Sequence, residues 1–169
     1  METVKTILAV VGIAESVVLI AGLAYGAVLW TRGIFPALWR LGNGLAKRNI
    51  AIFATPENSA SLRRLLLDSG LFKSNNILEI ARSEDIGVAE RASVYLVFWH
   101  DWAERIGEIL EKKPDGCALI VYAPRDRGQI PENLMKELDG HRHTAVTNFR
   151  GRLLNDIVTA MITTSYEQR

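Results

Sequence analysis

The chain has 169 residues, of which 49% are hydrophobic, and a formal net charge of +1 at pH 7. This length suits one ordinary domain with an appendage, and a charge so close to zero gives no reason to expect a nucleic-acid partner. The single cysteine, Cys117, excludes an internal disulfide, which suits a reducing compartment.

The first thirty residues are predicted to form a transmembrane helix. Between Thr6 and Trp30 the only charged residue is Glu15. At about 1.5 Å of rise per residue, a helix of this length crosses a hydrocarbon core of roughly 30 Å. The alternative is a cleaved signal peptide, because Ala24-Tyr25-Gly26 resembles a small-x-small cleavage site. The acidic residue and the long apolar run depart from that pattern and favour a retained helix.

The residues that follow the helix, 31–48, predict its orientation. They include four basic residues and no acidic one, namely Arg32, Arg40, Lys47 and Arg48. By the positive-inside rule this side lies in the cytoplasm, so we expect a single-pass protein of the inner or plasma membrane with its N-terminus outside. The aromatic residues placed to anchor the helix at the interfaces are Tyr25, Trp30 and Trp39. Residues 31–48 therefore form a basic amphipathic connector suited to the lipid headgroups.

Glu15 is an unusual residue for the middle of such a helix. A charged side chain at the bilayer centre costs on the order of 3 kcal/mol on insertion scales, so it normally faces protein or a water-filled space. Small residues at three- and four-residue spacing favour close helix packing, and here they are Gly12, Ser16, Gly22 and Gly26. We expect a homo-oligomer in which Glu15 lines or caps a cation path, or pairs with a basic residue of another membrane protein. The alternatives are a protonated acid that bonds a neighbouring helix in a static anchor, or a polar residue that is tolerated slightly away from the bilayer centre.

From residue 49 to residue 169 the sequence alternates short apolar runs with helical patterns. The predicted strands are Ile50–Ala54, Ile77–Ile80, Val94–Trp99, Ala118–Ala123 and Thr144–Phe149. Most of these runs are too short and too continuous to be amphipathic helices. Because parallel strands need crossover connections, five strands alternating with five helices predict an α/β domain with a five-stranded, doubly wound parallel sheet.

The start of the first of these helices is also predicted. Thr55 offers a cap, Pro56 stands at the first helical position, and Glu57 supplies an early negative charge. In the third connection, Trp102, Ile106 and Ile109 recur at helical spacing.

Polar residues after the strands are candidate ligand-binding residues, because ligands of such sheets lie outside the carboxyl ends of the strands. They are Thr55 and Asn58 after the first strand, Arg82 and Ser83 after the second, Arg125 and Arg127 after the fourth, and Arg150 and Arg152 after the fifth. Arginine side chains together with free backbone N–H groups hold phosphate or carboxylate. The arginines therefore predict a small anionic, nucleotide-like ligand, although no glycine-rich phosphate motif is present. The alternative is that these are ordinary polar loops.

His100 and Asp101 follow the third strand and are a candidate acid–base pair. Since they are adjacent in sequence, we do not expect their side chains to point at one another, and no nucleophile is placed beside them. His141 and His143 are too few for a zinc site, so no metal is expected.

The order of elements resembles the TIR domain, the toll/interleukin-receptor module, and in particular its divergent bacterial relatives. NIAIFATPENSASLRRLLLDSGLF is similar to the first strand and helix, RASVYLVFWHDWAERIGEIL to the third strand, loop and helix, and ALIVYAP to the fourth strand. Catalytic members carry a glutamate soon after a tryptophan. The resemblance implies that Glu104, two residues after Trp102, cleaves the nicotinamide–ribose bond of NAD, and His100 and Asp101 stand where that family has serines and an acid. The alternative for Glu104 is a solvated helix position.

Three functions remain open. The first is a sensor–effector, which resembles the membrane-anchored effectors of bacterial nucleotide-signalled antiviral defence, where ligand-driven oligomers permeabilise the inner membrane. The second is a membrane-tethered TIR-type enzyme that consumes NAD. The third is an adaptor that recruits partners to the membrane. We favour the first, because both Glu15 and the arginines after the strands have a use in it.

Overall fold

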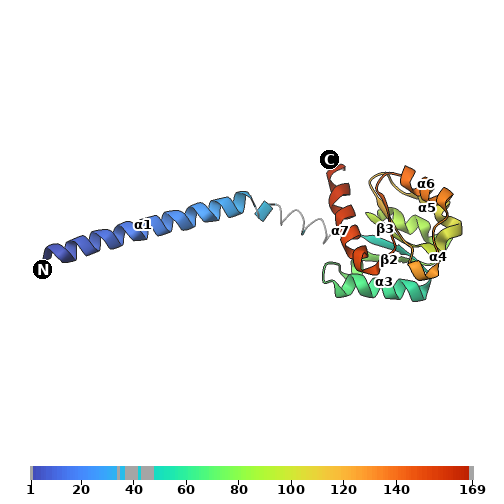
Figure 1. The fold of residues 1–169 in the computed structure, drawn as a ribbon, viewed down its shortest axis with the longest axis horizontal. Helices are drawn as coiled ribbons and strands as arrows, with labels where there is room; N and C mark the ends of the chain where they lie inside the picture. Colours follow the sequence, from blue (N-terminus) through green and yellow to red (C-terminus); the bar gives the residue numbers. More distant parts are fainter. Residues whose placement is uncertain (1, 34, 37–41, 43–47, 168–169) are drawn as a thin grey trace. The chain divides into compact units, whose positions relative to one another are not determined.

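The structure, a computed structural model, describes residues 2–33, 35–36, 42 and 48–167 (Figure 1). The chain divides into two compact units, Met1–Gly42 and Asn43–Arg169. Most of the connector predicted for residues 31–48 lies outside the described residues, and so do its residues Trp39, Arg40 and Lys47.

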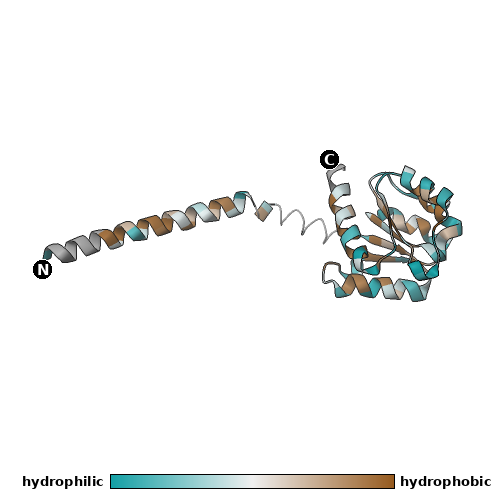
Figure 2. Cartoon of the chain, viewed as in Figure 1, coloured by the Kyte–Doolittle hydropathy of each residue, from teal (hydrophilic) through white to brown (hydrophobic). Residues whose placement is uncertain are grey.

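The first unit is dominated by one long helix, α1 (Glu2–Arg32). The four consecutive residues from Val17 to Ile20 are each between 60% and 73% exposed. Since successive residues are turned by about 100°, these four surround the helix, and this stretch is therefore apolar on all sides. Figure 2 shows brown, hydrophobic segments along α1 with shorter teal ones between them. Val11–Arg32, with a mean hydropathy of 1.9, is long and apolar enough to span a membrane. This confirms the predicted apolar helix; its length and composition suit a membrane span and also a signal sequence.

The second unit is built on a five-stranded sheet in which every pair of neighbouring strands is parallel. The strands are β1 (Ile50–Phe53), β2 (Ile77–Ile80), β3 (Val94–Phe98), β4 (Ala118–Tyr122) and β5 (Thr144–Thr147), in the order β2-β1-β3-β4-β5. The predicted five-stranded parallel sheet is thus confirmed. Four strands end one or two residues before their apolar runs do, because residues such as Ala54 and Trp99 are buried in the turns that follow.

Helices cover both faces of this sheet, as Figure 1 shows. One face carries α3 (Pro56–Asp68) and α7 (Arg150–Glu167). Leu62, Leu66, Leu153 and Ile157 of these two helices are buried there. The other face carries η2 (Ser83–Arg91), α5 (Ile106–Lys112) and α6 (Glu132–Gly140). Burial of each such aliphatic side chain stabilises the fold by roughly 1.5–3 kcal/mol. The apolar layer on the first face therefore holds α3 and α7 against the strands.

The helix predicted in the third connection is divided into three short pieces. These are α4 (Trp99–Trp102), η3 (Ala103–Arg105) and α5. The backbone leaves helical geometry at Trp102, whose φ is −128° and ψ is 12°. Its indole packs edge-on against Phe53 with ring centroids 5.4 Å apart. We attribute the break to this buried contact, which the helical spacing alone does not reveal. The remaining short turns are η1 (Ser74–Asn76) and η4 (Arg125–Arg127).

Arg48 precedes β1 and makes hydrogen bonds at the amino edge of the sheet, where the strands begin. Its guanidinium donates to the carbonyl oxygen of Met161 and, at 3.1 Å, to Oγ1 of Thr164, both near the end of α7. The amide of Asn76 donates to the carbonyl oxygen of Arg48 at 3.0 Å. A cation at the C-terminal end of a helix is favoured by the helix dipole, so this contact ties the first described residue of the unit to its last helix.

Candidate functional site

A pocket of about 180 Å³ lies at the carboxyl edge of the sheet. Its lining residues are Asn58, Ser61 and Leu62 of α3, Phe98 and Tyr122 of the strands, Pro124, Asp126 and Arg127 of the next turn, and Arg150 of α7. Phe98 and Tyr122 pair across β3 and β4, and their rings meet edge-on with centroids 5.7 Å apart. The pocket therefore has a rigid aromatic part supplied by the sheet and a charged part supplied by the loops.

Arg150 contributes one of the two positive charges in this pocket. Its Nη1 donates to Oγ of Ser61 at 3.0 Å, and its Nη2 donates to the carbonyl oxygen of the same residue at 2.9 Å. A guanidinium has five N–H donors, so most of them stay available. Arg150 is also the first residue of an 18-residue helix, where the helix dipole disfavours a cation and favours an anion. A bound anion would relieve this cost.

Arg127 contributes the second charge. Its guanidinium carbon lies 5.4 Å from the centroid of Phe98. Within the part of the chain that the structure describes, the side chain of Arg127 makes no hydrogen bond and no ion pair, and only its backbone N–H donates, to the carbonyl oxygen of Pro124 at 3.2 Å. The carboxylate of Asp126 lines the same pocket without pairing with either arginine among the described residues. The pocket is therefore left with net positive charge and unused donors, which suits a small anion.

Tyr122 supplies a neutral donor at the base of the pocket. Burial raises the pKa of its hydroxyl, while the positive charges of Arg150 and Arg127 act to lower it and the negative charge of Asp126 acts to raise it. Because the net effect is upward, the phenol stays protonated at physiological pH. It can then donate a hydrogen bond to an anion held by the two arginines.

Asp101 already provides a negative charge at the start of α3. Its Oδ2 accepts from the backbone N–H of Thr55 at 2.7 Å, from Oγ1 of Thr55 at 2.8 Å and from Nδ2 of Asn58 at 2.9 Å. Thr55 is the residue before the helix, as predicted, but its side chain does not cap the backbone. The predicted side-chain cap is therefore wrong, because the hydroxyl of Thr55 donates to the carboxylate of Asp101, which follows β3. An anionic ligand is therefore directed away from this helix start.

His100 does not form the acid–base pair with Asp101. Its ring lies 6.0 Å from that of Phe98, and its buried Nδ1 has no hydrogen-bond partner among the described residues. Gly128, whose φ of 107° is a conformation that side chains rarely adopt, lies against the same ring: a Cβ at this glycine would be 3.7 Å from Nε2 of His100. The histidine is thus packed beneath the turn that carries Arg127.

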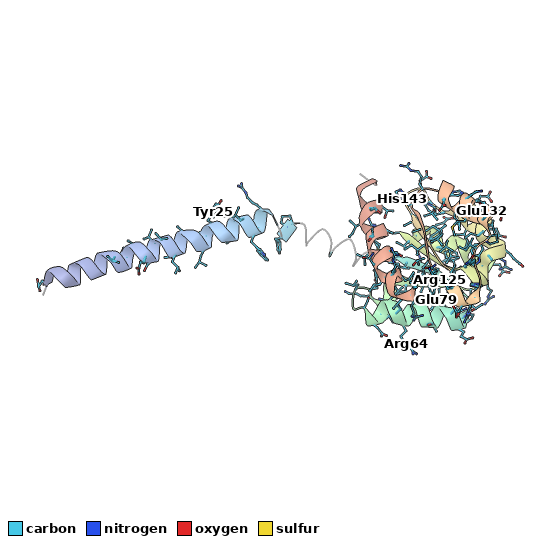
Figure 3. All side chains as sticks on the ribbon, viewed as in Figure 1. Tyr25, Arg64, Glu79, Arg125, Glu132 and His143 are labelled. Carbon is cyan, nitrogen blue, oxygen red and sulfur yellow. The ribbon has the colours of Figure 1, made fainter. Side chains whose placement is uncertain are left out.

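The structure brings together only some of the eight predicted ligand-binding residues. Three of them line the pocket, namely Asn58, Arg127 and Arg150. Thr55 does not line it, and its hydroxyl donates to Asp101. The others do not line it. The guanidinium of Arg125, a residue labelled in Figure 3, lies over the ring of Phe149. Arg152 is exposed on α7, and Arg82 and Ser83 follow β2. Two strands separate β2 from β4, a distance of roughly 14 Å at the usual strand spacing.

Ser61, Phe98 and Tyr122 line the pocket but were not among the predicted site residues, and the same holds for Leu62 and Pro124. Phe98 and Tyr122 belong to continuous apolar runs, and this pattern predicts burial in the core rather than a site. Their position at the ends of their strands is the signal that points to the pocket.

Glu104, the catalytic candidate from the TIR resemblance, lies outside the pocket. Its side chain is exposed in the turn η3, while Trp102 is buried beneath it against Phe53. The assignment of NAD cleavage to this glutamate stays a prediction, and the arrangement of the pocket gives it no support.

The candidate membrane residues lie on the surface of α1. Glu15 is exposed, and Oγ of Ser16 donates to the carbonyl oxygen of Gly12 at 2.8 Å within the helix. A Cβ added at Gly22 or Gly26 would meet no atom within 4 Å. The small residues therefore present open surface on α1, and their role in helix packing stays a prediction.

No known protein family, curated protein or solved structure matches this chain. Among the described residues, no group of three or more His, Cys, Asp or Glu side chains is placed to hold a metal ion. The fold is therefore established by the structure itself, and the site must be interpreted from its own chemistry.

Proposed function

We propose that this protein is a membrane-anchored sensor–effector. Its α/β domain binds a small anionic, nucleotide-like signal on the cytoplasmic side of the inner or plasma membrane. Binding drives homo-oligomerisation, and the assembled α1 helices alter the permeability of the membrane. The resemblance of the α/β unit to bacterial TIR-like domains extends this proposal to antiviral defence.

The pair of arginines in the pocket carries the proposal. Arg127 lies over an aromatic ring with its N–H donors unused in the described part of the chain, and Arg150 keeps most of its own. Both arginines are exposed, so their unused donors are accessible to a ligand from solution. Two guanidinium groups and a protonated phenol line the same pocket, and guanidinium groups are frequent ligands of phosphate because they donate two parallel hydrogen bonds.

The size of the pocket supports binding of an anionic group rather than of a whole small molecule. Sites that enclose a drug-sized ligand measure roughly 300–1,000 Å³, and this pocket measures about 180 Å³. A phosphate group fits such a volume. The rest of the ligand then stays outside the pocket, where it can reach the surrounding surface or a second copy of the chain.

The apolar helix supports the membrane part of the proposal. Val11–Arg32 is long enough to span a bilayer, and Glu15 interrupts its apolar surface near the middle of α1. Since a single helix cannot enclose a pore, the proposal requires several copies, with Glu15 facing the interior of the assembly.

Membrane potential in expressing cells tests this proposal. We expect cells that produce the wild-type protein to depolarise, and both Glu15→Gln and the double variant Arg127→Gln/Arg150→Gln to abolish the effect at equal protein levels. Arg64→Gln, which changes an exposed arginine of α3 outside the pocket, is the matched control and should depolarise like wild type.

NAD is measured in the same cultures. Depolarisation that is unchanged by Glu15→Gln and by the double arginine variant would contradict the proposal. Loss of NAD that disappears in Glu104→Gln would instead support the TIR-type enzyme.

A further inference from the structure

Phe149 is an exposed aromatic side chain next to the pocket. It is 47% exposed, and among residues 48–164, whose exposure the structure describes, no other phenylalanine, tyrosine or tryptophan is exposed. It follows β5 and directly precedes Arg150. The other exposed large apolar side chains of this unit are Leu71, Val88 and Ile162, which are aliphatic.

Arg125 covers one face of this ring. Its guanidinium carbon lies 4.5 Å from the centroid of Phe149, a distance at which a cation is attracted to the face of an aromatic ring. The pair joins the turn after β4 to the turn after β5 and holds the ring in place. Since nearly half of the side chain remains exposed, the ring still offers surface to a ligand.

The position of Phe149 matches where the rest of a ligand must extend. The pocket is too small for more than an anionic group, as argued above, and Arg150 is one of the two cations that hold this group. The Cα atoms of Phe149 and Arg150 are about 3.8 Å apart, as in any pair of adjacent residues. The ring is therefore attached to the backbone next to a residue that lines the pocket, and its partner Arg125 belongs to the same turn, η4, as the pocket residue Arg127.

We infer that the ligand is a nucleoside phosphate, with its phosphate between Arg127 and Arg150 and its base stacked on Phe149. This inference rests on the proposed function and specifies its ligand. Every nucleobase has a flat π-face that stacks on an aromatic ring. Arg125, on the other side of Phe149, places a positive charge at the same end of the site.

Calorimetric titration of the full-length protein in lipid nanodiscs tests the inference. The probes are adenosine 5′-monophosphate and ribose 5-phosphate, which differ only in the base. We expect the wild type to bind the nucleotide about tenfold more tightly, since one base stacked on an aromatic side chain contributes an effect of that order. Arg127→Gln should weaken the binding of both probes.

Substitutions at Phe149 locate the base. Phe149→Leu keeps an apolar side chain and removes the ring, so it should erase the preference for the nucleotide and leave the affinity for ribose 5-phosphate unchanged. Phe149→Tyr keeps the ring and should restore the preference. Far-UV circular dichroism and the thermal midpoint verify that each variant is folded.

The outcomes separate this inference from the proposed function. Equal affinity of the wild type for the two probes would overturn the inference and leave anion binding intact. A preference for the nucleotide that survives in Phe149→Leu would also overturn it, because the base would then lie elsewhere. Failure of the wild type to bind either probe would overturn the proposed function itself.

Discussion

The two edges of the sheet use the same kind of side chain in opposite ways. At the amino edge, Arg48 donates to the carbonyl oxygen of Met161. The ammonium of Lys113 donates to the carbonyl oxygen of Cys117 at 2.9 Å. At the carboxyl edge, Arg125 and Arg127 lie over aromatic rings. Both edges carry cations. At the carboxyl edge, Arg150 also donates to a carbonyl oxygen, that of Ser61, but among the described residues the guanidinium of Arg127 has no such partner.

The comparison separates cations that hold the fold together from cations that are available to a ligand. Arg48 is bonded to the C-terminal half of α7, the half whose end favours a cation, whereas Arg150 at the start of the same helix is disfavoured by the helix dipole. A buried or satisfied cation should affect the stability of the fold, and an unsatisfied one should affect binding. Substitutions at the two edges can therefore confirm or break this distinction.

The largest effect on stability is expected at Asp101, the carboxylate that satisfies the start of α3. Asp101→Ala removes the acceptor for Thr55 and Asn58 together with a charge that the helix start favours. We expect the free energy of unfolding in urea to fall by about 3 kcal/mol. Asp126→Ala, at the same edge but without a hydrogen bond in the described part of the chain, should change it by less than about 0.5 kcal/mol. Equal effects would mean that Asp101 does not stabilise this edge.

The next largest effect on stability is expected when an arginine is replaced by glutamine at the amino edge, and the same replacement at the carboxyl edge is the comparison. Arg48→Gln should lower the free energy of unfolding by about 2 kcal/mol, because the carbonyl oxygen of Met161 and the hydroxyl of Thr164 lose a charged donor. Arg127→Gln should lower it by less than about 0.5 kcal/mol. Urea denaturation at pH 7 measures both. A larger loss for Arg127→Gln would reverse the distinction between the edges.

A pH-dependent effect is expected from Cys117, which lies beneath the amino edge. Burial raises the pKa of its thiol from about 9 to about 12. Above pH 9 the unfolded chain releases the thiol proton while the folded chain retains it, so stability falls as pH rises. Between pH 9 and pH 10.5 the wild type should lose about 2 kcal/mol more than Cys117→Ala, which has no thiol. Parallel curves for the two proteins in urea denaturation would show that this thiol ionises normally in the folded state.

The smallest effect concerns the turn that carries Arg127. Gly128→Ala puts a side chain at a φ of 107°, which should cost about 1 kcal/mol of stability. Gly87→Ala is the matched control, since a Cβ there meets no atom within 4 Å and φ is not positive. Thermal unfolding measures the difference. A Gly128→Ala protein as stable as the control would show that the turn does not need this conformation.

Much of the fold could be predicted from the sequence, because continuous apolar runs of four to six residues mark strands buried on both faces. The run Ile77–Ile80 also matches β2 residue for residue, although it contains the exposed Glu79 and the strand lies at an edge of the sheet. The broken helix near Trp102 could not be predicted, since its cause is a contact with Phe53 from a distant strand. Local patterns report the element, whereas long-range packing decides where it is interrupted.

The candidate site could be predicted only in outline. The rule that ligands lie at the carboxyl ends of parallel strands selects Arg82, Arg127 and Arg150 alike as candidate ligand-binding residues. The order of the strands then separates them, because β2 lies on the far side of β1 while β3 and β4 are neighbours. The hydrogen bonds from Arg150 to Ser61 join residues 89 positions apart, and no spacing in the sequence reports such a contact.

The most direct test of the central claim is calorimetric titration of the full-length protein in nanodiscs with inorganic pyrophosphate. Wild type and Arg48→Gln should bind it with the same affinity, because the amino edge takes no part in binding. Arg127→Gln should bind at least tenfold more weakly, since it loses a charged donor to the anion. An affinity for pyrophosphate that is unchanged in Arg127→Gln, or the absence of binding to the wild type, would contradict the assignment of the carboxyl-edge pocket as an anion site.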